Sequence, residues 1–167
     1  PGVQARIKLG MRRDGKITAL EVHGVGDQGP YGGSGDMMNV AGIGSLCYQP
    51  TAVRMRGTNV YTNTPPRGPQ RAPGGVQSMT MLEPIIQQAA KQLGLDQVEV
   101  HMLNAPEGQA KFGPPGRTGE QGNVSSAFAK EAIAKGAELF NWEERKQRSG
   151  QRNGSKVTGI GMSLSAY

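Results

Sequence analysis

The amino-acid sequence predicts an α+β fold, in which a twisted mixed or antiparallel sheet that contains a hairpin packs against two or three helices. Residues 3–11 alternate between apolar and polar side chains, as a strand with one buried face does. The tight-turn pair Asp14-Gly15 follows, and residues 17–25 are expected to form the returning strand. After Gly75 the apolar period changes to that of a helix, so both kinds of element are present.

The first half of the chain contains two further segments before a third strand. The apolar phase slips between Ala19 and Leu20, which predicts a β-bulge in the returning strand. Residues 24–35 are rich in glycine and are expected to form a loop, while residues 37–47 are ambiguous between a short helix and a turn. Residues 53–61 alternate again and predict the third strand.

The second half is predicted to be mainly helical. An apolar stripe at helical spacing ends at Gly94, and Pro84 should kink this helix or mark its first turn. The stripe consists of Leu82, Ile85, Ile86, Ala89, Ala90 and Leu93. Asp96 and Glu99 have capping-box spacing, which predicts a second helix through about Asn104.

A loop is expected over residues 105–123, followed by a helix over about 126–147. This long helix is predicted to turn Phe128, Ala132, Leu139 and Phe140 inward. A polar linker then precedes a further strand over 157–167.

Composition limits the classes of protein that the chain can belong to. Only 35% of its 167 residues are hydrophobic, against roughly 45–50% in a typical globular domain, so several loops are expected to lie against other polypeptide. The net charge of +6 permits anionic partners, although the basic residues are scattered. The single cysteine excludes an internal disulfide framework and a cysteine-rich metal site. No run approaches the roughly 18–20 apolar residues of a membrane span, and the start at Pro1 suggests a piece of a longer chain.

The segment Thr62–Gly75 is the most informative part of the sequence. It holds four prolines and three glycines in fourteen residues, so it continues neither a strand nor a helix. It carries Arg67 and Arg71 and ends where a helix is predicted to begin. Backbone N–H groups at a helix start beside a guanidinium suit an anionic or oxygen-rich ligand. A rigid strand-to-helix connection with solvated arginines is the alternative.

Together with the element order, two motifs resemble the molybdenum-cofactor-binding large subunit of the xanthine oxidase family of molybdenum hydroxylases. One is the Thr-Asn-x-Pro-Pro segment that leads to Arg71-Ala-Pro-Gly74, and the other is Gly94-Leu-Asp-Gln-Val-Glu-Val-His-Met-Leu-Asn104. The second differs from the typical family pattern by Gln97 in place of proline and His101 in place of arginine. The resemblance implies that residues 1–155 are the central part of a larger molybdopterin-binding domain and that residues 156–167 begin its next half.

The resemblance also implies roles for particular residues. Arg71 matches the family arginine whose backbone amide meets the molybdenum centre and pterin, with Gln70, Ala72 and Gly74 beside it. Pro73 stands where purine-oxidising members carry an aromatic residue, and their purine-contacting arginine aligns near Asn39. Both residues are therefore weak candidates for the substrate pocket, and xanthine is not the expected substrate. Gln77 is expected to brace the loop.

The implied activity is the oxidative hydroxylation of an aldehyde or aromatic N-heterocycle with water as the oxygen source. The implied cofactor is molybdenum–molybdopterin, as the pterin cytosine dinucleotide in a bacterial enzyme, with iron–sulfur and flavin groups on other subunits or domains. The catalytic glutamate of the family lies outside this chain, so no catalytic residue and no metal ligand is expected here. The expected partners are the rest of the large subunit or other chains, an iron–sulfur subunit and a small-molecule substrate, without nucleic acid. A cytoplasmic and a periplasmic location both remain open.

Two other functions fit parts of the sequence. A basic module could bind anions or nucleic acid through scattered arginines, although the chain has few aromatic residues to stack on bases. These arginines are Arg12, Arg13, Arg54, Arg56, Arg67 and Arg71. A catalytically inactive assembly subunit is the other alternative. His23, His101 and Cys47 are expected to be packing or surface residues, and Glu83 to form a local ion pair.

Overall fold

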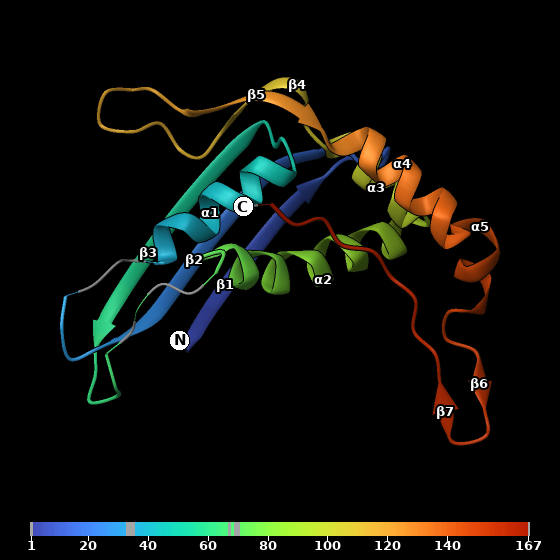
Figure 1. The fold of residues 1–167 in the computed structure, drawn as a ribbon, viewed down its shortest axis with the longest axis horizontal. Coiled ribbons are helices and arrows are strands. Elements are labelled where there is room, and N and C mark those ends of the chain that lie inside the picture. Colours follow the sequence, from blue (N-terminus) through green and yellow to red (C-terminus); the bar gives the residue numbers. More distant parts are fainter. Residues whose placement is uncertain (1, 33–35, 67, 69–70, 167) are drawn as a thin grey trace.

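A three-stranded sheet forms one layer of the molecule. The computed structural model describes residues 2–32, 36–66, 68 and 71–166. The strands are β1 (Val3–Met11), β2 (Ile17–Gly29) and β3 (Ala52–Tyr61), in the order β1-β2-β3. Strand β1 runs antiparallel to β2, whereas β3 runs parallel to β2. The sheet is therefore mixed, and the predicted α+β fold is confirmed (Figure 1).

The β1–β2 hairpin forms where the sequence predicts it. Gly15 has φ +88°, which the tight turn requires, and the backbone N–H of Lys16 donates to the Asp14 carboxylate. The register shifts between Gly10 and Met11, so that Thr18 is the extra residue of β2. The bulge thus lies one residue before the predicted position, and it explains why the apolar phase of β2 changes.

The prediction of a glycine-rich loop from residue 24 is wrong for its first part, because β2 continues to Gly29. The glycines of this stretch make room for the helix α1 (Asp36–Cys47). A Cβ atom added to Gly24 would lie 2.0 Å from Met37 Cε, and one added to Gly57 would lie 3.0 Å from Met37 Cβ. The missing side chains therefore let the start of α1 approach β2 and β3 closely.

Two helices follow β3 and confirm the predicted change of period. The first, α2 (Gly75–Leu93), ends at Gly94 in the left-handed conformation. Pro84 lies inside this helix and is exposed. Asp96 caps the second, α3 (Gln97–Asn104), by accepting hydrogen bonds from the backbone N–H groups of Val98 and Glu99.

The expected loop over residues 105–123 is wrong for residues 107–112 and 122–123, which belong to a second hairpin, whereas residues 113–121 are irregular. This hairpin is formed by β4 (Glu107–Phe112) and β5 (Gly122–Phe128), which pair antiparallel. The strand segments are largely exposed and polar, so they lack the alternation that marks a strand with one buried face.

The expected helix over 126–147 is interrupted. It is divided into α4 (Ala129–Phe140), α5 (Trp142–Arg145) and a 3₁₀ turn over Lys146–Arg148. The break is at Asn141, which has φ 55°. The predicted inward residues Phe128, Ala132, Leu139 and Phe140 are all exposed. Ile133 of α4 is buried instead, so α4 packs through a different face than the predicted one, and Trp142 of α5 is buried as well.

The predicted strand over 157–167 is wrong for the residues that the structure describes. A small hairpin of β6 (Arg152–Asn153) and β7 (Lys156–Val157) is followed by an extended segment without regular structure. This segment lies along α2 because Gln87 Nε2 donates to the Met162 carbonyl at 2.7 Å and the Leu164 N–H donates to Glu83 Oε1 at 3.1 Å. These two hydrogen bonds go to helix side chains rather than to a strand.

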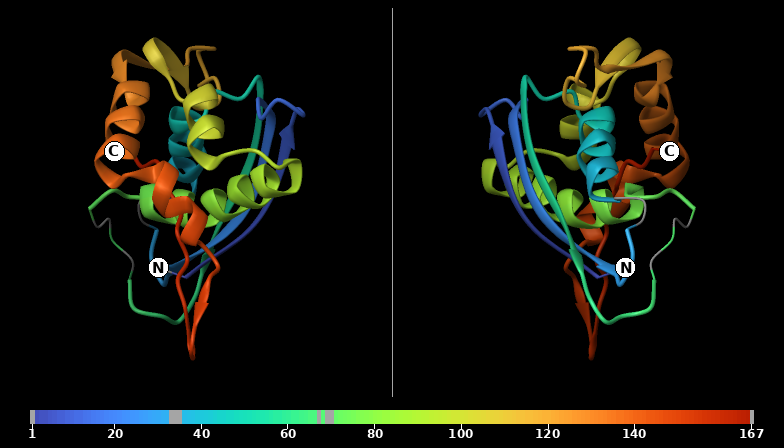
Figure 2. Two further views of the ribbon diagram at one scale, coloured as in Figure 1. Left: turned by 90° about the vertical axis from the view of Figure 1, so that its right-hand side faces the viewer. Right: turned by 90° about the vertical axis from the view of Figure 1, so that its left-hand side faces the viewer.

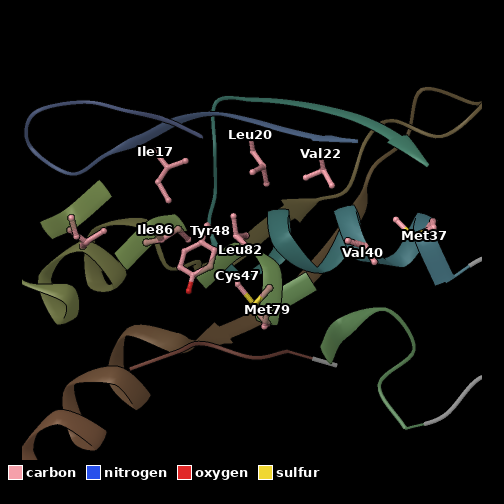
Figure 3. Close-up of a cluster of buried hydrophobic side chains, with 12 residues drawn as sticks. Ile17, Leu20, Val22, Met37, Val40, Cys47, Tyr48, Met79, Leu82 and Ile86 are labelled. Atoms are coloured by element: carbon pink, nitrogen blue, oxygen red, sulfur yellow. The ribbon is translucent and has the colours of Figure 1, made fainter. Parts of the chain in front are cut away.

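The core lies between the sheet and the helices α1, α2 and α3. Figure 2 shows the helices gathered on one side of the sheet. Figure 3 shows side chains of β2 facing those of α1 and α2 across this layer. The core residues drawn and labelled there are Ile17, Leu20, Val22, Met37, Val40, Cys47, Tyr48, Met79, Leu82 and Ile86.

Candidate functional site

The segment that joins β3 to α2 is held at its beginning by Asp27 of β2. The hydroxyl groups of Thr62 and Thr64 both donate hydrogen bonds to the Asp27 carboxylate, as does the backbone N–H of Gly29 at 3.1 Å. A Cβ atom on Gly29 would lie 2.8 Å from the Pro65 carbonyl oxygen, and the φ of Gly29 is +79°. The loop therefore leaves the sheet in one defined direction.

The same loop ends in a tight turn just before α2. Ala72 has φ 58° and Gly74 has φ 79°, so two residues of this turn are left-handed. The Ala72 carbonyl accepts a hydrogen bond from the Gly75 N–H at 2.9 Å. A left-handed alanine costs of order 1–3 kcal/mol and is found most often where the surrounding structure imposes it, as at binding sites. Arg71, directly before this turn, is exposed.

The first turn of α2 offers hydrogen-bonding groups to a ligand. Gly74 provides no side-chain cap, and the first turn carries no acidic residue that would neutralise the positive end of the helix dipole. The Oε1 atom of Gln77 is buried and accepts no hydrogen bond from the residues that the structure describes. Such an acceptor is normally paired, so this one is suited to an N–H or O–H donor of a bound group.

The structure brings four of the six predicted site residues together. Arg71, Ala72, Pro73 and Gly74 form the turn before α2, whereas Gln70 lies outside the described residues. Asn39 is an exposed residue near the start of α1, and this end of α1 lies on the same side of the molecule as the turn (Figures 1 and 2). Gln77, which was expected to brace the loop, is the third residue of α2 and is partly buried.

A buried polar cluster around Glu83 was not predicted. Glu83 belongs to α2, His101 to α3, and Tyr48 follows directly after the end of α1; the three residues are 5%, 0% and 1% exposed, respectively. The Tyr48 hydroxyl donates to Glu83 Oε1, and His101 Nε2 lies 2.9 Å from Glu83 Oε2. The Leu164 N–H donates to the same carboxylate at 3.1 Å. The carboxylate therefore joins α2 to α3, to the residue that follows α1 and to the C-terminal segment.

Burial and the Glu83 carboxylate also determine the state of the neighbouring side chains. Burial first, and then the negative charge of Glu83, raises the pKa of the Cys47 thiol to about 12. The same two causes raise the pKa of the Tyr48 hydroxyl well above its usual range. Cys47 is therefore a protonated, buried thiol at neutral pH, which agrees with its predicted role as a small hydrophobic residue rather than a nucleophile.

Two further observations concern the described residues as a whole. Across them, no group of three or more His, Cys, Asp or Glu side chains is arranged to hold a metal ion. None of the helices in the described ranges is long and apolar enough to cross a membrane.

Comparison with known proteins places this chain within a family. Residues 1–105 match the family described as the molybdopterin cofactor-binding domain. The chain is 29% identical over 163 residues to a putative xanthine dehydrogenase molybdenum-binding subunit of Escherichia coli strain K12, covering 96% of this chain and 21% of that protein. It is 32% identical over 108 residues to the nicotinate dehydrogenase large molybdopterin subunit of Eubacterium barkeri, covering 63% of this chain and 25% of that protein. The chain thus spans about a quarter or less of these relatives.

Solved structures show the same architecture. The aldehyde oxidoreductase of Desulfovibrio gigas superimposes with a TM-score of 0.70 at 25% identity, over 88% of this chain and 16% of that one. The quinoline 2-oxidoreductase of Pseudomonas putida 86 superimposes with a TM-score of 0.68, also at 25% identity, over 87% of this chain and 19% of that one.

Proposed function

Because the chain belongs to the molybdopterin cofactor-binding domain family, we propose that its β3–α2 loop forms one wall of the cofactor site. Within that family the chain belongs to the molybdenum-binding subunits of the xanthine oxidase family. The enzyme that contains it would hydroxylate an aldehyde or an aromatic N-heterocycle, with water as the source of oxygen. The observation that supports this role most directly is the left-handed turn at Ala72, which presents backbone groups at the start of an uncapped helix.

The described residues fit a group with both hydrogen-bond donors and negative charge. The pterin ring of molybdopterin carries N–H groups that could donate to the buried Gln77 Oε1, and the phosphate groups of the cofactor suit the positive end of α2. Arg71 adds a cation next to the turn. Bound molybdenum–molybdopterin supplies the two-electron oxidation of the substrate. The role of this chain is to hold the cofactor, while the catalytic carboxylate belongs to another part of the enzyme.

The turn and the names of two structural relatives support an expectation about the substrate class. Ala72-Pro73-Gly74 offers no aromatic ring to sandwich a purine, and Asn39 is not a cation that would contact one. Among the structural relatives, one is named for aldehydes and one for quinoline, whereas a sequence relative is named for xanthine. We therefore favour an aldehyde or N-heterocycle over xanthine. The cofactor form proposed is the cytosine dinucleotide, with iron–sulfur and flavin groups on other subunits or domains.

Replacement of Arg71 in the native enzyme tests the proposal. Arg71→Ala should lower the molybdenum content per protein, or the turnover of an aldehyde such as benzaldehyde and of quinoline, by about tenfold or more, because residues that support a metal site typically contribute factors of that size. Arg71→Lys should restore part of the loss if charge is what matters. Arg152→Ala, an exposed arginine on the remote β6–β7 hairpin, is the matched control.

Native levels of both molybdenum and turnover in Arg71→Ala would remove Arg71 from the site. A native protein that contains no molybdenum at all would instead favour the inactive assembly subunit. Metal analysis by mass spectrometry therefore distinguishes a wrong role for Arg71 from a wrong function for the whole chain.

A further inference from the structure

The face of the β1–β2–β3 sheet that points away from the helices is covered by no other element among the described residues (Figure 2). This is unusual for a sheet with a parallel pair, because parallel strands are generally buried on both faces. The cross-strand register identifies the side chains on this outer face. They lie in four rows, namely Gly10–Ala19–Ala52, Lys8–Glu21–Arg54, Arg6–His23–Arg56 and Gln4–Val25–Thr58.

The outer sheet face, defined by these four rows, is basic. Arg6, Lys8, Arg54 and Arg56 stand on it against a single carboxylate, Glu21. Lys8 Nζ lies 3.9 Å from Glu21 Oε2, and the two side chains are 69% and 41% exposed, so this ion pair contributes little to stability. The charges are thus not explained by the folding of the sheet itself.

The outer sheet face is also hollowed. The small residues Gly10, Ala19 and Ala52 lie side by side across the three strands, next to the row Lys8–Glu21–Arg54. These two rows line a shallow depression of about 460 Å³. Small side chains form the bottom of this depression, and Lys8 and Arg54 lie at its border. It can therefore receive an acidic side chain of a partner, whose carboxylate would form an ion pair with Lys8 or Arg54.

We propose that the outer sheet face docks an acidic segment of a partner protein. The face is too polar to be the missing half of a hydrophobic core, so its partner must be polar as well. Three of its four cations are arginines, whose planar groups bind carboxylates through two parallel hydrogen bonds and are enriched at protein interfaces.

Nucleic acid suits the outer sheet face less well than an acidic protein does. Glu21 lies in the middle of the basic rows and would repel a phosphate backbone, whereas a basic residue of a protein partner could pair with it. The four rows contain no aromatic side chain on which bases could stack, apart from the imidazole of His23. This inference goes beyond the proposed cofactor site. That site includes the start of α2, which packs on the inner face of the sheet, whereas the proposed docking surface is the outer sheet face.

The experiment measures the binding of a synthetic decaglutamate peptide and of a ten-nucleotide single-stranded DNA to the native protein by fluorescence anisotropy. The variant Arg54→Glu/Arg56→Glu should weaken peptide binding at least tenfold. The control Arg152→Glu/Lys156→Glu makes the same change in net charge on the β6–β7 hairpin and should change it less than twofold. Molybdenum content should stay at the native level in both variants, which separates this test from that of Arg71.

Three outcomes would overturn the proposal. In the first, the native protein does not bind the peptide. In the second, the two double variants lose peptide affinity equally. In the third, the native protein binds the DNA more tightly than the peptide, and Arg54→Glu/Arg56→Glu weakens the binding of both equally. Carbodiimide cross-linking of the unsubstituted protein to the peptide gives a second measurement that needs no variant. It should join the peptide to Lys8, and a cross-link from Lys8 to Glu21 alone would count against the outer sheet face.

Discussion

At the scale of single residues, Ala72 shows how the loop before α2 obtains its shape. A left-handed alanine is unfavourable in isolation, so its surroundings must select it. Those surroundings are the hydrogen bond from Gly75 to the Ala72 carbonyl and the left-handed Gly74 that follows. The turn fixes the direction of the backbone immediately after Arg71. A rigid turn lowers the entropy that a cofactor would lose on binding, which is the advantage of a preorganised site.

Asp96 is the residue with the clearest dependence on pH. Burial opposes its ionisation, but hydrogen bonds from Lys146, Trp142 and the backbone of Glu99 and Val98 outweigh burial and lower the pKa of its carboxyl group. Because the folded pKa lies below the unfolded value, the stabilisation is present at neutral pH and is lost as the pH falls through the folded pKa. Asp96→Asn should therefore cost about 1–2 kcal/mol of unfolding free energy at pH 7, and less near pH 3.

Urea unfolding at several pH values between 3 and 7 measures this difference. Glu131→Gln is the matched control, since Glu131 is an exposed carboxylate in the first turn of α4. A cost for Asp96→Asn that is the same at pH 3 and pH 7 would show that the charge of Asp96 contributes nothing.

At the scale of secondary-structure elements, the Glu83 cluster connects the helices to the C-terminal segment. Glu83→Ala leaves the Tyr48 hydroxyl, the His101 ring and the Leu164 N–H without their buried partner. We expect a loss of about 2–4 kcal/mol in the free energy of unfolding, because buried polar groups without partners are costly. Glu83→Gln keeps part of the hydrogen bonding and should lose less.

Urea denaturation measures the stability of these Glu83 variants, and limited proteolysis measures release of the segment after Val157. The variant Glu131→Ala, on an exposed helix face, should change neither quantity. If Glu83→Ala unfolds no more easily than Glu131→Ala, the cluster does not hold these elements together.

The elements that local sequence patterns determine were predictable, and those that depend on distant contacts were not. Alternation revealed β1, and Asp96 and Gly94 marked the ends of helices, because each signal lies within a few residues. The extension of β2 through its glycines depends on pairing with β1 and β3, and these glycines leave room for Met37 of α1; sequence spacing reveals neither contact. The hairpin of β4 and β5 has no buried alternating face, so no pattern distinguishes it from a loop.

The candidate site was predictable to a similar extent. The loop stood out through its prolines and glycines, and the resemblance drew attention to Arg71. The unpaired Gln77 oxygen and the contact of Glu83 with three elements are consequences of folding, and no motif indicates them.

At the scale of the whole molecule, the chain buries few of its large apolar side chains outside the central layer. Phe128 and Leu139 are 69% and 76% exposed, although both belong to the region next to α3. The low hydrophobic content provides few side chains for a core, and some of these side chains face outward. Because the relatives are several times longer than this chain, we expect further polypeptide to cover these positions in the native enzyme.

The exposed and buried residues of α4 should therefore respond differently to a charge. Leu139→Lys should change the unfolding free energy of this chain alone by no more than about 0.5 kcal/mol, as for other surface substitutions. Ile133 is only 5% exposed, so Ile133→Lys buries a charge without a partner. It should lower the free energy of unfolding by more than about 2 kcal/mol. In the native enzyme, Leu139→Lys should instead weaken assembly, measured as dissociation on size-exclusion chromatography. If the isolated chain tolerates Leu139→Lys and the native enzyme is equally unaffected, this face of α4 is a solvent-exposed surface in both, and the apolar side chains on it need no covering polypeptide.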